Sequence, residues 1–150
     1  GQAWGLYGYT MMYRFTKDTR YLEQAVKIAE FILNHPNMPE DLVPYWDYNA
    51  LDIPNTLRDA SAAAISCAGL FELCRYVSEN SRQKYFEAAE KMLQELSSSE
   101  YMAEVGTNGG FILKHSVGNM LAGTEVDAPL TYADYYFVEA LCRYKSLTNK

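Results

Sequence analysis

Two short motifs recur along the chain at long intervals, and this repetition constrains the fold more than any other feature of the sequence. Residues 73–76 and 141–144 both read Leu-Cys-Arg-Tyr, and residues 12–15 carry the variant Met-Tyr-Arg-Phe. Residues 21–27, Tyr-Leu-Glu-Gln-Ala-Val-Lys, return at 85–91 as Tyr-Phe-Glu-Ala-Ala-Glu-Lys. These intervals exceed the roughly 20–50 residues of most solenoid repeats. They predict a helical hairpin with a long functional loop as the repeating unit.

Hydrophobic periodicity divides the chain into helices of two kinds. Segments that are apolar on nearly every side are expected to be inner, buried helices, and segments charged on one side to be outer, amphipathic ones. Inner helices are predicted at about 4–16, 59–77 and 132–144, and outer helices at about 19–33 and 81–96. The sequence ends before an outer partner follows the third inner helix, so the last repeat is expected to be half a unit.

The alternation of inner and outer helices predicts an all-α fold. A toroid of helical hairpins is favoured over a bundle, because the inner helices are too apolar to face water on any side. A closed ring needs more hairpins than 150 residues supply. The chain is therefore expected to be the carboxy-terminal portion of a single barrel domain, with an open apolar edge that promotes self-association.

Two long connections, at about 34–58 and 97–131, interrupt the helices. Loops longer than about 12–15 residues are usually functional. The first contains Pro-Tyr-Trp-Asp-Tyr at 44–48, and the second contains an apolar stretch near 111–113 that is expected to form a short strand. Both lead into the amino end of an inner helix, so both are expected to gather at one mouth of the ring.

Composition excludes several classes of function. The formal net charge is −6 at pH 7 and no cluster of Lys and Arg is visible, which argues against nucleic acid and membrane surfaces as partners. The three cysteines, Cys67, Cys74 and Cys142, are interpreted as small buried hydrophobes. His35 and His115 lie far apart with no Cys beside them, so neither a metal site nor a cofactor is predicted. The 14% of aromatic residues favours a ligand cleft.

Five motifs occur in order along the chain: Gly-Gln-Ala-Trp-Gly-Leu-Tyr-Gly at 1–8, Pro-Tyr-Trp-Asp at 44–47, Arg-Asp-Ala-Ser-Ala-Ala-Ala at 58–64, His-Ser-Val at 115–117 and Ala-Asp-Tyr-Tyr at 133–136. Together they resemble the unsaturated glucuronyl hydrolases, glycoside hydrolase family 88. The resemblance implies part of a six-hairpin (α/α)6 barrel, in a cytoplasmic or periplasmic enzyme. It also implies release of the unsaturated uronic acid that polysaccharide lyases leave at the non-reducing end of glycosaminoglycan oligosaccharides, by hydration of the C4–C5 double bond.

The resemblance implies an oligosaccharide substrate, and it directs attention to the mouth of the ring. Both catalytic aspartates of the family are expected upstream of the Gln-Ala-Trp motif, so no catalytic residue is assigned here and the chain alone is expected to be inactive. The candidate substrate-binding residues are Gln2, Trp4, Trp46, Asp59, Ser61, His115 and Ser116.

A structural role is the alternative for most of these candidates. Asp59 precedes an Ala-rich helix and is interpreted first as its N-cap. The indoles of Trp4 and Trp46 can stack on a sugar or pack against the protein. Arg58 can bind a substrate carboxylate or form a surface ion pair, and His115 can bind a sugar hydroxyl or sulfate or be structural.

Other functions stay open at this point. An unsaturated rhamnogalacturonyl hydrolase that acts on pectin fragments is the nearest enzymatic alternative, and the region around His115 and Ser116 is where the difference is expected. A non-catalytic helical-repeat interaction module is the alternative from another class. Asp134 begins the third inner helix, where a negative charge complements the helix dipole, and is interpreted as structural.

Overall fold

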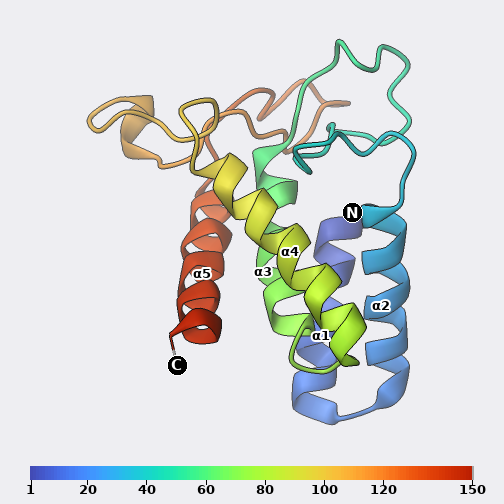
Figure 1. The fold of residues 1–150 in the computed structure, drawn as a ribbon. Coiled ribbons are helices and arrows are strands. Elements are labelled where there is room, and N and C mark those ends of the chain that lie inside the picture. The colour runs from blue at the N-terminus through green and yellow to red at the C-terminus, as the bar shows by residue number, and fades with distance from the viewer. Residues whose placement is uncertain (150) are drawn as a thin grey trace.

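The computed structural model describes residues 1–149, which are helical with long loops (Figure 1). The helices are α1 Gln2–Thr16, α2 Thr19–Leu33, α3 Ala60–Leu73, α4 Glu79–Leu96 and α5 Thr131–Thr148, with a short 3-10 helix η1 Asn108–Gly110. Within these residues the expected short strand near 111–113 is absent. Leu113 makes only an isolated antiparallel bridge to Met102, so that prediction was wrong.

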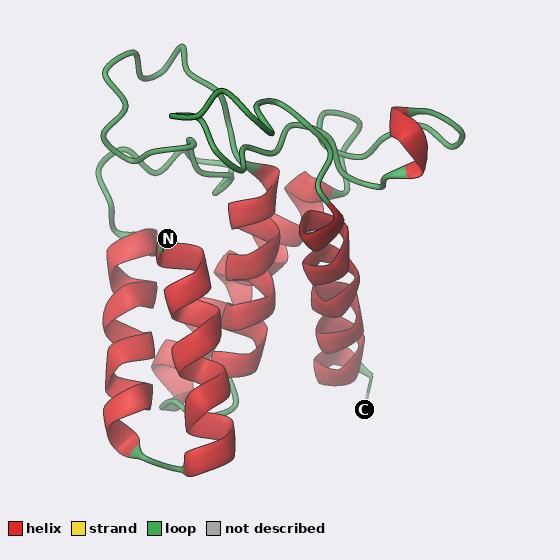
Figure 2. Cartoon of the chain, turned by 180° about the vertical axis from the view of Figure 1, so that it is seen from behind, coloured by secondary structure: helices red, strands yellow, loops and turns green. Residues whose placement is uncertain are grey.

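The helices alternate between an inner and an outer row. α3 packs against both α1 and α5, while α2 packs on α1 and α4 packs on α3. Opposite views show α1, α3 and α5 side by side with α4 across one face of α3 (Figures 1 and 2). The inner and outer assignments made from the sequence are confirmed. No helix among residues 1–149 is long and apolar enough to cross a membrane.

Local signals set most of the helix ends. The carboxylate of Asp18 accepts a hydrogen bond from the Arg20 amide at 3.0 Å and caps α2. Lys17 adopts a left-handed conformation, with φ of 58°, and ends α1. α3 ends at Leu73, earlier than the sequence predicted, because the amides of Arg75 and Tyr76 bond three residues back and form a turn. The repeated Leu-Cys-Arg-Tyr motif therefore ends α3 but lies inside α5.

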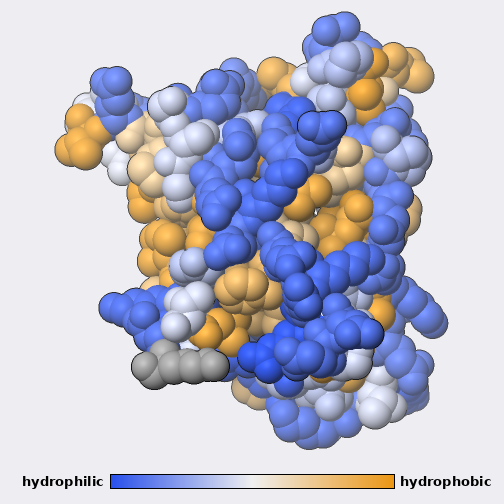
Figure 3. Space-filling view, viewed as in Figure 1, coloured by the Kyte–Doolittle hydropathy of each residue, from blue (hydrophilic) through white to orange (hydrophobic). Residues whose placement is uncertain are grey.

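Burial differs among the three inner helices. Every residue of α3 is buried except Ala62, because neighbouring helices cover it on several sides. α1 and α5 instead expose large apolar side chains, including Phe15 at 72% and Tyr135 at 59%, and apolar surface is visible over α5 in Figure 3. These exposed apolar side chains form the open edge that the sequence predicted for part of a ring. Cys67 and Cys74 are buried as predicted, whereas the prediction of a buried side chain was wrong for Cys142, which lies exposed on α5.

A buried polar network joins the inner helices. The Arg143 guanidinium on α5 lies 2.7 Å from the Glu72 carboxylate on α3 and 3.2 Å from that of Glu139. It also donates to the carbonyl oxygen of Ala68 at 2.6 Å. Arg14 on α1 reaches the same Glu72 carboxylate at 3.4 Å. Since Glu72 is only 4% exposed, these partners compensate for the water that its carboxylate loses on burial.

We expect residues 1–150 produced alone to self-associate at micromolar concentration, because α1 and α5 expose apolar side chains that water disfavours. Light scattering over a dilution series measures this. Replacing Phe15 and Leu141 with serine should reduce association. The matched substitutions Leu51→Ser and Val105→Ser, at exposed loop positions, should not. A stable monomer throughout the series would contradict the expectation.

Glu72→Ala should lower the free energy of unfolding by about 3 kcal/mol, because it leaves the Arg143 guanidinium, 12% exposed, without its nearest carboxylate. Urea unfolding measures the change. Glu79→Ala is the control: Glu79 is 84% exposed and lies 3.7 Å from Arg82, so its loss should cost about 0–1 kcal/mol. Equal losses for the two variants would show that the buried network does not stabilise the fold.

Candidate functional site

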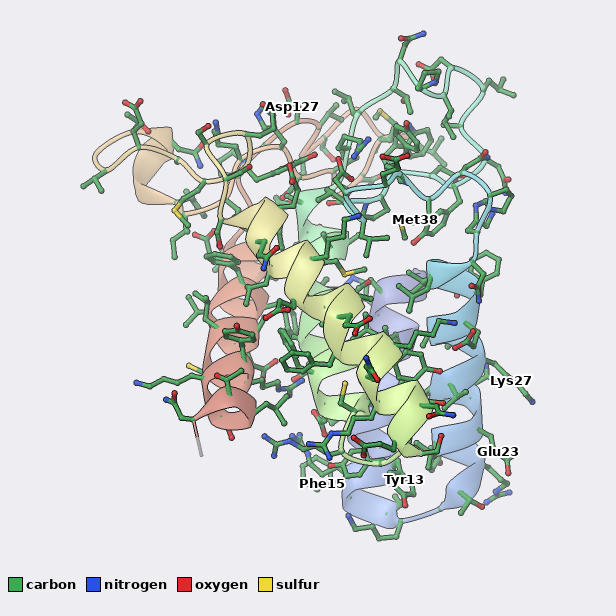
Figure 4. All side chains as sticks on the ribbon, in the orientation of Figure 1. Tyr13, Phe15, Glu23, Lys27, Met38 and Asp127 are labelled. Carbon is green, nitrogen blue, oxygen red and sulfur yellow. The ribbon has the colours of Figure 1, made fainter. Side chains whose placement is uncertain are left out.

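The two long loops lie over the amino ends of α1, α3 and α5, at one end of the molecule (Figure 2). Figure 4 shows the same arrangement with side chains, with Asp127 in the loops and Phe15 at the opposite end. This is the gathering of loops that the sequence predicted. The candidate site is therefore built from main-chain segments that are far apart in sequence.

Asp59 is the junction between both loops and α3. Its amide donates to the carbonyl oxygen of Pro44 in the first loop at 2.8 Å. The next amide, of Ala60, donates to the carbonyl oxygen of His115 in the second loop at 3.0 Å. The amide of Val117 donates to the Asp59 carboxylate at 3.2 Å. One residue thus fixes both loops at the first turn of the central helix.

Asp59 is nearly enclosed, with 9% of the residue exposed. Its Oδ1 accepts from the Ser61 amide at 3.0 Å and from the Ser61 hydroxyl at 2.6 Å, which confirms the N-cap interpretation. Burial raises the pKa of the Asp59 carboxyl above its ordinary value, and the hydrogen bonds from Ser61 and Val117 oppose that rise.

Two adjoining cavities of about 270 and 290 Å³ open beside this junction. Five residues border both of them: Gly1, Ala3, Trp46, Asp59 and Ala62. Trp4, Ser61, Tyr132 and residues 117–121 border the first alone. Gln2, Phe31, Tyr45, Asp47 and Tyr48 are among those that border the second alone. Five candidates, Gln2, Trp4, Trp46, Asp59 and Ser61, are therefore brought together.

Aromatic rings form much of the cavity walls. Trp4 is 46% exposed and packs edge-on against Tyr136, with ring centroids 5.3 Å apart. The Trp46 indole N–H donates to the Thr56 hydroxyl at 3.1 Å, which fixes the orientation of that ring. Burial, and secondarily the charge of Asp59, raises the pKa of Tyr48 to about 12, so its phenol stays a neutral hydrogen-bond donor. Fixed rings of this kind suit stacking on the apolar face of a sugar.

The structure places the other two candidates outside both cavities. His115 lies in the second loop with its Nδ1 atom 2.6 Å from Oδ1 of Asp127. Ser116 is fully buried, and its hydroxyl has no partner among residues 1–149. Their contribution to sugar binding stays a prediction.

Two charged residues hold the loops rather than border the cavities. Arg58 pairs with Asp41, donates to the carbonyl oxygen of Val43 at 2.9 Å and lies over the Tyr45 ring, so it forms an internal ion pair. The Asp134 carboxylate accepts from the amides of Ile112 and Leu113 at 2.8 and 2.9 Å. It anchors the second loop to α5, a role that no local pattern in the sequence indicates.

The cavities carry no cationic side chain. None of the described residues that border them is Lys, Arg or His, and the charged side chains there are Asp59 and Asp47. No group of three or more metal-ligating side chains occurs within residues 1–149. This part of the site therefore combines aromatic surfaces with hydroxyl, amide and carboxylate groups, which can bind a polyhydroxylated ligand.

Comparison with known proteins gives a consistent result. The unsaturated glucuronyl hydrolase of Formosa agariphila is 47% identical over 150 residues, which are 100% of this chain and 37% of that protein. A crystal structure of an unsaturated glucuronyl hydrolase specific for heparin superposes with a TM-score of 0.96 at 52% identity, over 100% of this chain and 40% of that one. No family model matches.

The structure of a ligand complex also matches. A variant of the Streptococcus agalactiae unsaturated glucuronyl hydrolase, solved with dGlcA-GalNAc6S, has a TM-score of 0.87 at 35% identity. The match covers 97% of this chain and 39% of that one. The chain thus spans less than half the length of the relatives it matches. Its helical hairpins form part of an α/α barrel, as the sequence predicted.

The raised pKa of Asp59 predicts a pH-dependent stability. A carboxyl group with a raised folded-state pKa stabilises the fold most at pH values below its ordinary pKa of 3.8, and this contribution is lost as the pH rises through the folded-state pKa. We expect the stability of the wild type relative to Asp59→Asn to fall from pH 3.8 toward neutrality. Tyr48 and Tyr132, which face Asp59, titrate far above this range. Urea unfolding at a series of pH values measures the difference.

Asp18→Asn is the control because Asp18 also caps a helix. Its hydrogen bond from Arg20 lowers the pKa of Asp18, so its stabilising contribution is present above the ordinary pKa and lost as the pH falls. The two variants should therefore show pH dependences of opposite sign. If the stability of both variants relative to the wild type changed with pH in the same direction, burial would not be the dominant influence on the pKa of Asp59.

Proposed function

We propose that this chain, a homologue of the unsaturated glucuronyl hydrolases over its whole length, supplies the carboxy-terminal portion of such a hydrolase. The enzyme releases the unsaturated uronic acid from the non-reducing end of glycosaminoglycan oligosaccharides that lyases produce. The observation that carries the proposal is the similarity of the entire chain, loops included, to a solved enzyme of this kind.

The geometry of the site supports this proposal. The two cavities are each close to the roughly 300 Å³ at which ligand pockets begin. Trp46 borders both of them and is fixed by its bond to Thr56, so its ring is a preformed stacking surface. Gln2 and Ser61 add polar groups that can orient sugar hydroxyls. A preorganised surface of this kind reduces the entropic cost of binding.

The proposed chemistry differs from ordinary glycoside hydrolysis. A proton is delivered to C4 of the unsaturated ring and water adds to C5, which gives a hemiketal that opens and releases the sugar. The proton donor is a carboxyl group that stays protonated near neutral pH, as burial or a second carboxylate allows. We assign no catalytic residue within this chain, because the catalytic aspartate pair of the family is expected upstream. The role proposed for this chain is to bind and orient the substrate.

Turnover of defined disaccharides tests the proposal. The full-length protein and residues 1–150 alone are incubated with unsaturated chondroitin and heparin disaccharides, and the ultraviolet absorbance of the conjugated double bond is followed. We expect the absorbance to fall with the full-length protein only. A folded full-length protein that leaves every glycosaminoglycan disaccharide intact would overturn the proposal. Activity only on pectin-derived unsaturated disaccharides would assign the chain to the rhamnogalacturonyl hydrolases.

A further inference from the structure

The two oxygens of the Asp59 carboxylate have different environments. All three hydrogen bonds to this group, from the Ser61 amide, the Ser61 hydroxyl and the Val117 amide, are accepted by Oδ1. The Ala62 amide also approaches the carboxylate and helps to lower its pKa, but among residues 1–149 the hydrogen bonds of good geometry are the three to Oδ1. Oδ2 is also not among the side-chain atoms that are both fully enclosed and unpartnered. It therefore keeps access to solvent.

The exposed part of Asp59 borders the two adjoining cavities, which we call the cleft. The residue is 91% buried and borders both cavities, so Oδ2, the oxygen that the helix cap does not use, is the one available to the space where they adjoin. A buried polar atom without a protein partner costs free energy unless water or a ligand satisfies it. Oδ1 is held by the helix cap, which leaves the side chain no freedom to turn Oδ2 away. The carboxylate thus offers the cleft a hydrogen-bond acceptor whose position is fixed by the helix cap.

The charge around Oδ2 restricts what it can bind. The described walls of the cleft contain no Lys, Arg or His side chain, and the other charged side chain there, Asp47, is also acidic. Asp47 accepts from the Asn49 amide at 2.7 Å and is exposed. A sugar hydroxyl can donate to Oδ2. A sulfate or carboxylate group has no proton to donate and would meet a like charge.

Building on the proposed function, we infer that Asp59 is a specificity-determining residue of the substrate cleft. Its Oδ2 accepts a hydrogen bond from a hydroxyl group of the bound disaccharide and disfavours a sulfate group at that position. Its Oδ1 meanwhile caps α3 and holds the second loop. The same side chain therefore has two roles. It holds the loop that shapes the cleft, and it favours a substrate that carries a hydroxyl rather than a sulfate group where it contacts Asp59.

Asp59→Asn separates the two roles. Asparagine is an equally good N-cap, and its amide oxygen must occupy the Oδ1 position to accept from Ser61 and Val117. The amide NH₂ group then replaces Oδ2 as a neutral donor. Asp59→Ser, which also caps a helix, removes the second oxygen altogether. Asp18→Asn is the matched control, because it makes the same change at a helix cap at the other end of α1 and α2.

The test measures kcat/KM of the full-length protein and these variants on unsaturated chondroitin disaccharides that are unsulfated, 4-sulfated or 6-sulfated. Binding of the same disaccharides is measured by calorimetry. We expect Asp59→Asn and Asp59→Ser to lose about tenfold or more in kcat/KM and affinity for the unsulfated disaccharide. For at least one sulfated disaccharide the two variants should lose less kcat/KM and affinity than this. The preference for the unsulfated over the sulfated disaccharide should therefore be smaller in the variants than in the wild type. Asp18→Asn should leave all values unchanged, and circular dichroism should show all variants folded.

Several outcomes would overturn the inference. Folded Asp59→Asn with wild-type kcat/KM, affinity and sulfation preference would show that Asp59 acts only as a helix cap. Equal losses on every disaccharide would exclude its role in discrimination. If the wild type binds the disaccharides but does not turn them over, the proposed function is wrong. The inference about Asp59 can still be tested, because the affinities of the variants are measured separately. Absence of binding by the wild type would defeat both.

Discussion

The carboxylate at the amino end of α3 is the contact on which the architecture of the site depends. Asp59 uses its main chain to hold the first loop and its Oδ1 to hold the second, while it caps the most deeply buried helix. Amides at the start of a helix have no partner within the helix and must find one elsewhere. Here the loops supply those partners, so the end of the barrel and the cleft are built by the same bonds.

Small side chains let the inner helices pack closely against one another. Alanine occupies much of the first turns of α3, which lets α1 and α5 approach it closely. Gly69 on α3 shows how tight the packing is, because a Cβ there would lie 3.1 Å from the Leu6 side chain. Near the other end of α3, the ion pair between Glu72 and Arg143 joins α3 to α5. α3 is thus fixed at both ends by polar contacts and along its length by small side chains.

The sequence predicted the parts of this structure that local patterns encode. The repeats and the periodicity located all five α-helices, and Asp59 before an Ala-rich run was identified as a cap. The end of α3 and the exposure of Cys142 were missed, because both depend on which neighbours pack nearby rather than on local propensity. The anchor between Asp134 and the amides of Ile112 and Leu113 was missed for the same reason. Five candidate residues meet at the cavities, whereas His115 and Ser116 lie next to them in the loop.

The bond between the Ala60 amide and the carbonyl oxygen of His115 has a consequence for how such a site can change over evolution. Because it joins main chain to main chain, it does not depend on the side chain that residue 115 carries. The neighbouring segment, residues 117–121, borders the first cavity. Mutations can therefore alter the rim of this cavity while the segment keeps its attachment to the helix. The sequence of the rim can therefore vary without a large loss of stability, as expected for a loop on a rigid scaffold.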